Sequence, residues 1–89
     1  MIMKQRIAAD LTRALAPVTL EVVDESHLHE GHAGSRPGGQ THFRVHVVAP
    51  AFAGKGRVER HRMIYAALAQ EIADGVHALA LDAKAPGEK

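Results

Sequence analysis

The apolar positions at the start of the chain follow two different periods, which predict a helix and then a strand. Over residues 2–15, apolar side chains recur every three or four positions, and charged or polar side chains fill the gaps. This apolar stripe consists of Ile2 or Met3, Ile7, Leu11, and Ala14 or Leu15. Pro17 ends the predicted amphipathic helix. Over residues 18–23 the period becomes two, which predicts a half-buried strand.

The second half of the chain alternates between the same two periods. Residues 42–49 predict a strand with Phe43, Val45 and Val47 on one face and His42, Arg44 and His46 on the other. Residues 57–73 predict a helix whose stripe contains Val58, His61, Ile64 with Tyr65, Leu68 and Ile72. Residues 77–83 predict a last strand, on which His77, Leu79 and Leu81 share a face.

The order of these elements is α-β-β-α-β. The first two strands predict an antiparallel hairpin, and a strand–helix–strand connection favours a right-handed crossover with parallel pairing. We therefore expect an α+β domain over residues 1–89, with a three-stranded mixed sheet and the helices on one face. Glycine and proline mark residues 26–41 as a long loop between the first two strands. The tail, residues 85–89, is expected to be frayed.

Composition limits the function more by what the chain lacks than by what it holds. The 89 residues carry eleven Lys and Arg against ten Asp and Glu, so the formal net charge of +1 does not require nucleic acid or an anionic membrane as partner. No apolar run approaches the roughly 18–20 residues of a membrane span. The sequence also contains no leader-like apolar segment, and we expect a cytoplasmic protein.

Seven histidines and no cysteine make imidazole the candidate metal ligand of this chain. Three of the histidines, His27, His29 and His32, lie close together in the loop. They either bind a metal such as zinc or nickel or belong to a solvated polar loop, because their spacing matches no strong zinc motif. His61 falls on the predicted helix stripe, where a partly buried, hydrogen-bonded ring is typical. His77 begins the last strand, where its role is either structural or functional.

A glycine-rich, basic segment precedes the second helix. Glycines at positions 54 and 56 would let an anion approach the backbone at a helix N-terminus. The positive side chains here are Lys55, Arg57, Arg60 and Arg62, which predict either a phosphate-binding face or an ordinary solvated helix entry. No nucleophile–base pair stands out elsewhere in the sequence, and we do not expect a stand-alone enzyme.

Several motifs in the same order resemble the BolA family over about residues 4–84. They are LEVVDES at 20–26, THFRV at 41–45, FAGK at 52–55, ERHRMIY at 59–65 and VHALAL at 76–81. The resemblance implies a fold similar to class II KH domains, in agreement with the order derived above. It departs at Gly56, where many relatives have serine, and this removes a potential helix cap or phosphate contact.

The resemblance also implies a function. BolA-like proteins pair with monothiol glutaredoxins of the CGFS type and share a 2Fe–2S cluster, for which the partner's cysteine and glutathione supply sulfur. Carried over by position, the ligands of this chain are His77 at the strand start and His32 in the loop. We expect an adaptor in iron–sulfur trafficking or iron sensing, monomeric or weakly dimeric when alone. The alternative implied by the family is a DNA-binding regulator of stress response and morphology, with Lys55, Arg57, Arg60 and Arg62 as its contact face.

Overall fold

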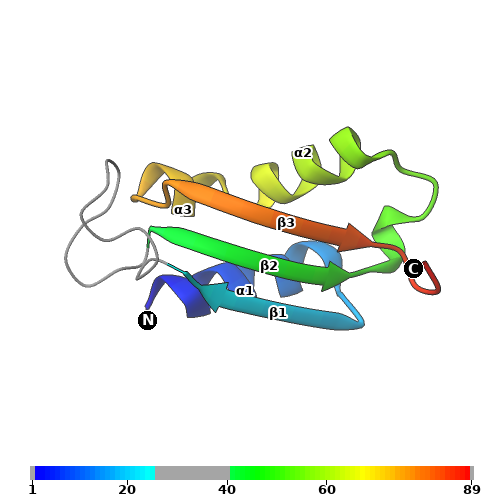
Figure 1. The fold of residues 1–89 in the computed structure, drawn as a ribbon, viewed down its shortest axis with the longest axis horizontal. Coiled ribbons are helices and arrows are strands. Elements are labelled where there is room, and N and C mark those ends of the chain that lie inside the picture. Colours follow the sequence, from blue (N-terminus) through cyan, green and yellow to red (C-terminus); the bar gives the residue numbers. More distant parts are fainter. Residues whose placement is uncertain (1, 26–40, 89) are drawn as a thin grey trace.

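The computed structural model describes residues 2–25 and 41–88, and these form three helices, a short 3-10 turn and one sheet (Figure 1). The elements are α1 (Met3–Leu15), β1 (Thr19–Asp24), β2 (His42–Val48), η2 (Pro50–Phe52), α2 (Arg57–Ala67), α3 (Ala69–Ala73) and β3 (Ala78–Lys84). The α-β-β-α-β order is as predicted, except that the helix expected over residues 57–73 is divided at Leu68. Of the predicted loop, only Thr41 lies among the described residues.

The sheet is mixed and has the order β1-β2-β3, so β2 is its central strand. β1 and β2 pair antiparallel, with Val22 opposite Val45, and β2 and β3 pair parallel, with Val45 opposite Leu81. The long helices α1 and α2 join β2 in one apolar core, and α1 lies behind the sheet in Figure 1. This confirms the three-stranded mixed sheet of an α+β domain.

The first helix buries the stripe that the sequence predicts. Its buried residues are Met3, Ile7, Leu11 and Leu15, and they meet Phe43, Val45 and Val47 from the central strand. The helix ends at Ala16, which has a φ of 45° and donates its N–H to the carbonyl of Thr12 at 3.0 Å. A left-handed residue that closes the last turn, followed by a proline, is a common helix stop.

The apolar stripe of the second helical segment differs from the prediction at both ends. Val58 is 64% exposed, and the fully buried residues are Ile64 and Leu68. The next buried position is Glu71 rather than Ile72, which is 37% exposed. At the second position, an ion pair with Arg6 accommodates the buried carboxylate of Glu71.

That ion pair ties α1 to α3. Arg6 donates to Glu71 Oε2 at 3.2 Å and to Asp74 Oδ2 at 2.5 Å, so a single guanidinium joins the first helix to the turn before β3. Burial raises the pKa of the Glu71 carboxyl, and the nearby Asp10 acts in the same direction. Arg6 lowers the pKa of Asp74. Because its partners are about seventy positions apart, no local sequence pattern indicates this contact.

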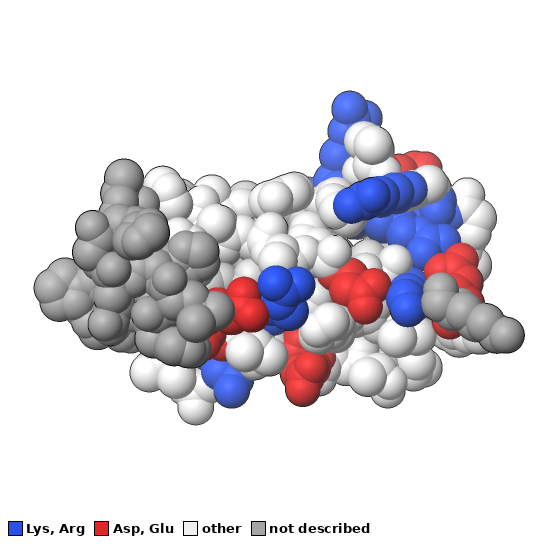
Figure 2. All heavy atoms as spheres, in the orientation of Figure 1, with Lys and Arg blue, Asp and Glu red and all other residues white. Residues whose placement is uncertain are grey.

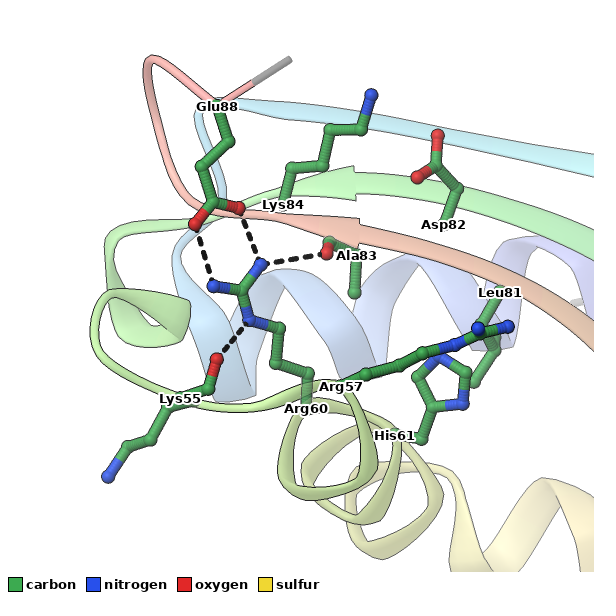
Figure 3. Close-up of a pocket in the computed structure, with 9 residues that line it drawn as sticks. All are labelled: Lys55, Arg57, Arg60, His61, Leu81, Asp82, Ala83, Lys84 and Glu88. Atoms are coloured by element: carbon green, nitrogen blue, oxygen red, sulfur yellow. Dashed lines mark hydrogen bonds and ion pairs between the residues drawn. The ribbon is translucent and has the colours of Figure 1, made fainter.

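In the tail that is predicted to fray, Glu88 is hydrogen-bonded to the start of α2 (Figure 3). Arg60 donates to both carboxylate oxygens of Glu88, at 2.6 and 2.8 Å. The same guanidinium donates to the carbonyls of Lys55 at 2.8 Å and Ala83 at 3.1 Å. Ala85 is buried and donates its N–H to Glu88 Oε1 at 2.9 Å. Arg60 therefore fastens the chain beyond β3 to the start of α2. Lys89 lies outside the described residues.

Replacement of Ile64 by alanine should destabilise the domain by about 2–5 kcal/mol, because it removes a fully buried aliphatic side chain from the core. Val58→Ala is the control on the same helix, since an exposed side chain there should contribute less than about 0.5 kcal/mol. The measurement is urea unfolding of both variants. Equal losses of stability would contradict the observed stripe.

Replacement of Glu88 by glutamine should remove part of the acid-side pH dependence of stability. Arg60 holds the pKa of Glu88 at about 2, against an ordinary value of 4.5. This carboxylate therefore contributes stability above about pH 4.5 that is lost as the pH falls towards 2. Urea midpoints measured from pH 7 down to pH 2.5 should fall less steeply in Glu88→Gln than in the wild type.

Glu59→Gln is the matched control for this prediction, because its carboxylate makes only an exposed contact of 3.6 Å with Lys55 Nζ. In Glu59→Gln the urea midpoint should fall with decreasing pH as steeply as in the wild type. If Glu88→Gln and the wild type lose stability in parallel as the pH falls, the carboxylate–guanidinium contact does not stabilise the fold.

Candidate functional site

His77 lies directly before β3, at the end of the sheet where β2 and β3 both begin, and this end is called the mouth of the sheet below. Its side chain is exposed. Its N–H donates to the carbonyl of Thr41 at 2.7 Å, and the N–H of Ala78 donates to the same oxygen at 3.1 Å. Two donors on one carbonyl fix the backbone where the parallel pairing of β2 and β3 begins. The predicted ligand His77 is therefore an accessible imidazole on a rigid backbone.

His42 is the neighbour of His77 and is buried, although the sequence pattern predicts it on the polar strand face with Arg44 and His46. The residue is only 7% exposed, and its ring centre lies 5.4 Å from that of His77 with a tilt of 52°. Its Nδ1 lies 2.8 Å from the hydroxyl of Thr41. Strand alternation places His42 with Arg44 on the open face of the sheet, which is the face away from the helices. The hydrogen bonds of residues 77 and 78 to the Thr41 carbonyl then bring the His77 ring against the His42 ring.

Apolar side chains surround the exposed side of His77. Tyr65 and Ile72, which are 44% and 37% exposed, line a small hollow of about 70 Å³ together with Val76, His77 and Leu79. From their spacing, Tyr65 and Ile72 are predicted to lie on the apolar stripe of the second helix. The break between α2 and α3 instead leaves both residues partly exposed beside the imidazole.

The described residues do not contain a complete metal site. Within 2–25 and 41–88 no group of three or more His, Asp or Glu side chains is arranged to hold a metal ion, and the sequence has no cysteine. The predicted loop ligand His32 lies outside the described residues, as do His27 and His29. The described part of the chain therefore presents an imidazole pair at this end of the sheet.

A second candidate region is a basic hollow of about 400 Å³ between the start of α2 and the end of β3 (Figure 3). Lys55, Arg57 and Arg60 line it, whereas Arg62 is exposed outside it. Arg60 is not available there, because Glu88 and two carbonyls occupy its donors. In the close-up, Lys55 points away from the hollow and Arg57 lies beside His61.

The electrostatic character of this region is mixed rather than uniformly basic. Figure 2 shows Lys and Arg gathered at the end of the molecule where α2 begins, with acidic groups next to them. Asp82 and Glu88 contribute to the lining of the hollow. Of the four predicted nucleic-acid contacts, the exposed Arg57 and Arg62 are the ones for which no ion pair is found among the described residues. His61 is half-buried, close to what the helix stripe predicts.

The open face of the sheet, on the side away from the helices, carries polar contacts between neighbouring strands and segments. His46 Nδ1 lies 3.0 Å from Asp82 Oδ2, and Arg44 Nε lies 3.0 Å from Glu25 Oε2. His46 is partly exposed, in agreement with its predicted place on the polar surface. Separately, none of the helices in the described part of the chain has the length and apolar character needed to cross a bilayer.

Comparison with known proteins relates this geometry to a family. The sequence pattern described as BolA-like protein matches residues 11–88. The Escherichia coli protein named DNA-binding transcriptional regulator BolA is 48% identical over 81 residues, which are 91% of this chain and 73% of that protein. SufE-like protein 1 of Arabidopsis thaliana is 47% identical over 87 residues, and the match spans 93% of this chain but only 24% of that protein.

Solved structures agree in fold. The BolA domain of SufE1 from Arabidopsis thaliana superposes with a TM-score of 0.87 at 45% identity, over 97% of this chain and 94% of that chain. BolA1 from the same plant gives a TM-score of 0.87 at 34% identity, over 100% and 98% of the two chains. Identity at this level, over nearly the whole chain and with the same arrangement of helices and strands, shows that this protein belongs to the BolA-like family.

Proposed function

We propose that this protein is a non-catalytic adaptor that shares a 2Fe–2S cluster with a monothiol glutaredoxin of the CGFS type. The observation that carries the proposal is the state of His77: an exposed imidazole whose backbone is fixed by the Thr41 carbonyl, in a chain without cysteine. Imidazole is a good iron ligand. The described residues supply too few ligands to hold a metal unaided, which favours a site completed by a partner.

The ligand atoms would determine the reduction potential of the shared cluster and how easily it releases iron. This chain would supply nitrogen through His77 and a second histidine, His32 by position in the family, while the glutaredoxin and glutathione would supply sulfur. Two imidazoles on one iron raise the reduction potential above that of an all-thiolate cluster. Because imidazole protonates near neutral pH, the nitrogen side is also the side from which iron is more easily released.

The surroundings of His77 are suited to docking. The partly exposed Tyr65 and Ile72 beside the imidazole provide apolar area that a partner would bury, and Tyr is a residue type that interfaces favour. A similar domain within a protein named SufE-like agrees with a role in iron–sulfur metabolism. The glutaredoxin would thus contact the α2–α3 surface while its cluster meets His77.

The second candidate function is DNA binding, which is favoured by the name of the Escherichia coli relative, DNA-binding transcriptional regulator BolA. The exposed Arg57 and Arg62 and the basic hollow at the start of α2 are the surface on which it would depend. The commitment of Arg60 to Glu88 reduces the positive charge available to phosphates there. We rank this function below the adaptor for that reason.

Substitution of His77 by alanine should remove the histidine features from the absorption and magnetic-circular-dichroism spectra of the mixed complex with a CGFS glutaredoxin. It should also weaken cluster retention, because one nitrogen ligand is lost. His46→Ala is the control, since that ring is held by Asp82 on the open face. A His77→Ala complex with an unchanged spectrum would rule out the assignment of this ligand.

Double substitution of Arg57 and Arg62 by alanine tests the DNA-binding function by duplex binding across a salt series. If these residues contact phosphates, the slope of log K against log salt should become shallower by about one for each arginine removed. Lys4→Ala, an exposed cation on α1, is the control and should leave the slope unchanged. Absence of binding by the wild type even at low salt would eliminate this function.

A further inference from the structure

The carboxylate of Glu88 occupies a set of hydrogen-bond donors that would equally suit an external anion. Arg60 donates to its two oxygens at 2.6 and 2.8 Å, and the N–H of Ala85 donates to the first of them at 2.9 Å. These donors hold the pKa of Glu88 at about 2, so the group that they bind is an anion at neutral pH. The forked guanidinium matches carboxylate and phosphate alike. The chain thus places one of its own carboxylates in an anion-binding arrangement.

The guanidinium of Arg60 is held in place by contacts that do not involve Glu88. The carbonyl of Lys55 accepts a hydrogen bond from Arg60 Nε at 2.8 Å, and the carbonyl of Ala83 accepts one from Nη1 at 3.1 Å. The guanidinium carbon also lies 5.9 Å from the centre of the Phe52 ring. Because these contacts orient Arg60 by themselves, the fork would keep its direction when the carboxylate leaves. A donor that is already oriented loses little entropy when it binds.

A short turn at the surface brings Glu88 to this position. Its N–H donates to the carbonyl of Ala85 at 3.1 Å, and Gly87 between them has a φ of 87°. Proline at position 86 followed by a glycine with positive φ is typical of a type II turn. Residues 86–88 are exposed, whereas Ala85 is buried. The turn can therefore open, and Glu88 can leave Arg60, without disturbing the core.

The hollow beside this pair has room and charge for a larger anion than a carboxylate. Its volume is about 400 Å³, and Arg57 and Lys84 line it together with Arg60. In Figure 3 the carboxylate of Glu88 faces the guanidinium of Arg60. When Glu88 leaves, Asp82 is the carboxylate that remains among the described lining residues. A phosphate carries more negative charge and more acceptor oxygens than a carboxylate, so it gains more from the neighbouring cations.

We propose that the Arg60 guanidinium and the Ala85 N–H form a phosphate-binding site, which Glu88 masks by occupying it. The ligand is a phosphate group, either free or part of a nucleic-acid backbone. This site goes beyond the adaptor function, and it lies on the surface of the DNA-binding candidate without requiring that the phosphate belong to DNA. Masking reduces the apparent affinity by the fraction of molecules in which the site is free. The tail therefore controls how strongly this end of the molecule binds phosphate.

The test is a titration of the full chain with inorganic phosphate at pH 7 and constant ionic strength, followed through the nitrogen–proton NMR signals of the Ala85 amide and Arg60 Nε. Removal of the mask in Glu88→Ala should tighten phosphate binding about tenfold, since a hydrogen-bonded charged group no longer competes. Glu59→Ala, which removes the same charge from the first turn of α2, is the matched control and should bind like the wild type. Addition of Arg60→Lys to Glu88→Ala should cancel the gain, because lysine keeps the charge but not the fork.

Gly87→Ala provides a second way to open the site, because alanine disfavours the positive φ of the turn and leaves the charge unchanged. It should also tighten phosphate binding. The proposal is overturned if Glu88→Ala binds phosphate no more tightly than Glu59→Ala, or if the signals that shift are not those of Ala85 and Arg60. If Glu88→Ala does not fold, the comparison of Gly87→Ala with the wild type decides in the same way.

Duplex DNA titrated across a salt series then identifies the source of the phosphate. A slope of log K against log salt that is steeper by about one in Glu88→Ala than in Glu59→Ala supports a contact of the unmasked site with the DNA backbone. If Glu88→Ala gains affinity for phosphate and no variant binds DNA, the site takes free phosphate and the DNA-binding candidate alone fails. If the wild type binds DNA and Glu88→Ala gains nothing with phosphate, this proposal fails and the DNA-binding candidate stands.

Discussion

The carbonyl of Thr41 is the contact on which the arrangement of the candidate site depends. It accepts the N–H groups of both His77 and Ala78, and parallel pairing of β2 with β3 begins there. A parallel pair needs a long crossover, and here α2 and α3 supply it. The last residues of that crossover therefore lie beside the start of the central strand, β2. Histidines 35 positions apart in sequence therefore meet as a consequence of strand pairing, with no local motif to bring them together.

Much of the fold could be predicted from the sequence, because each element has a clear apolar period. The stripe of α1 and the inward face of β2, with Phe43, Val45 and Val47, are what the spacing indicates. The second helical segment was less predictable. Its buried stripe passes through Glu71, and a pattern of apolar residues cannot reveal a carboxylate that is accommodated by a distant Arg6.

The candidate site was predictable only in part. His77 could be chosen from its place at a strand start and from the family resemblance, whereas His42 looked like a surface residue, because period-two alternation placed it with Arg44 and His46. Its burial arises from tertiary contacts at the strand ends. The basic face was predicted from residue types alone, and type does not show whether a charge is available. Both terminal nitrogens of the Arg60 guanidinium donate hydrogen bonds to the Glu88 carboxylate, while Arg57 on the same helix is exposed.

These two arginines bear on how the functions should be weighed. An anion that approaches the start of α2 meets a guanidinium that is already neutralised and acidic groups that line the same hollow, so electrostatic attraction there is weak for the number of cations present. At the other end of the sheet, His77 is exposed and oriented, is flanked by apolar area and lies beside a second imidazole. The exposed imidazole and the apolar area beside it thus lie together at the mouth of the sheet, whereas at the start of α2 Arg57 is the one arginine lining the hollow for which no ion pair is found among the described residues. For this reason we rank the proposed metal-centred partnership above the proposed phosphate recognition.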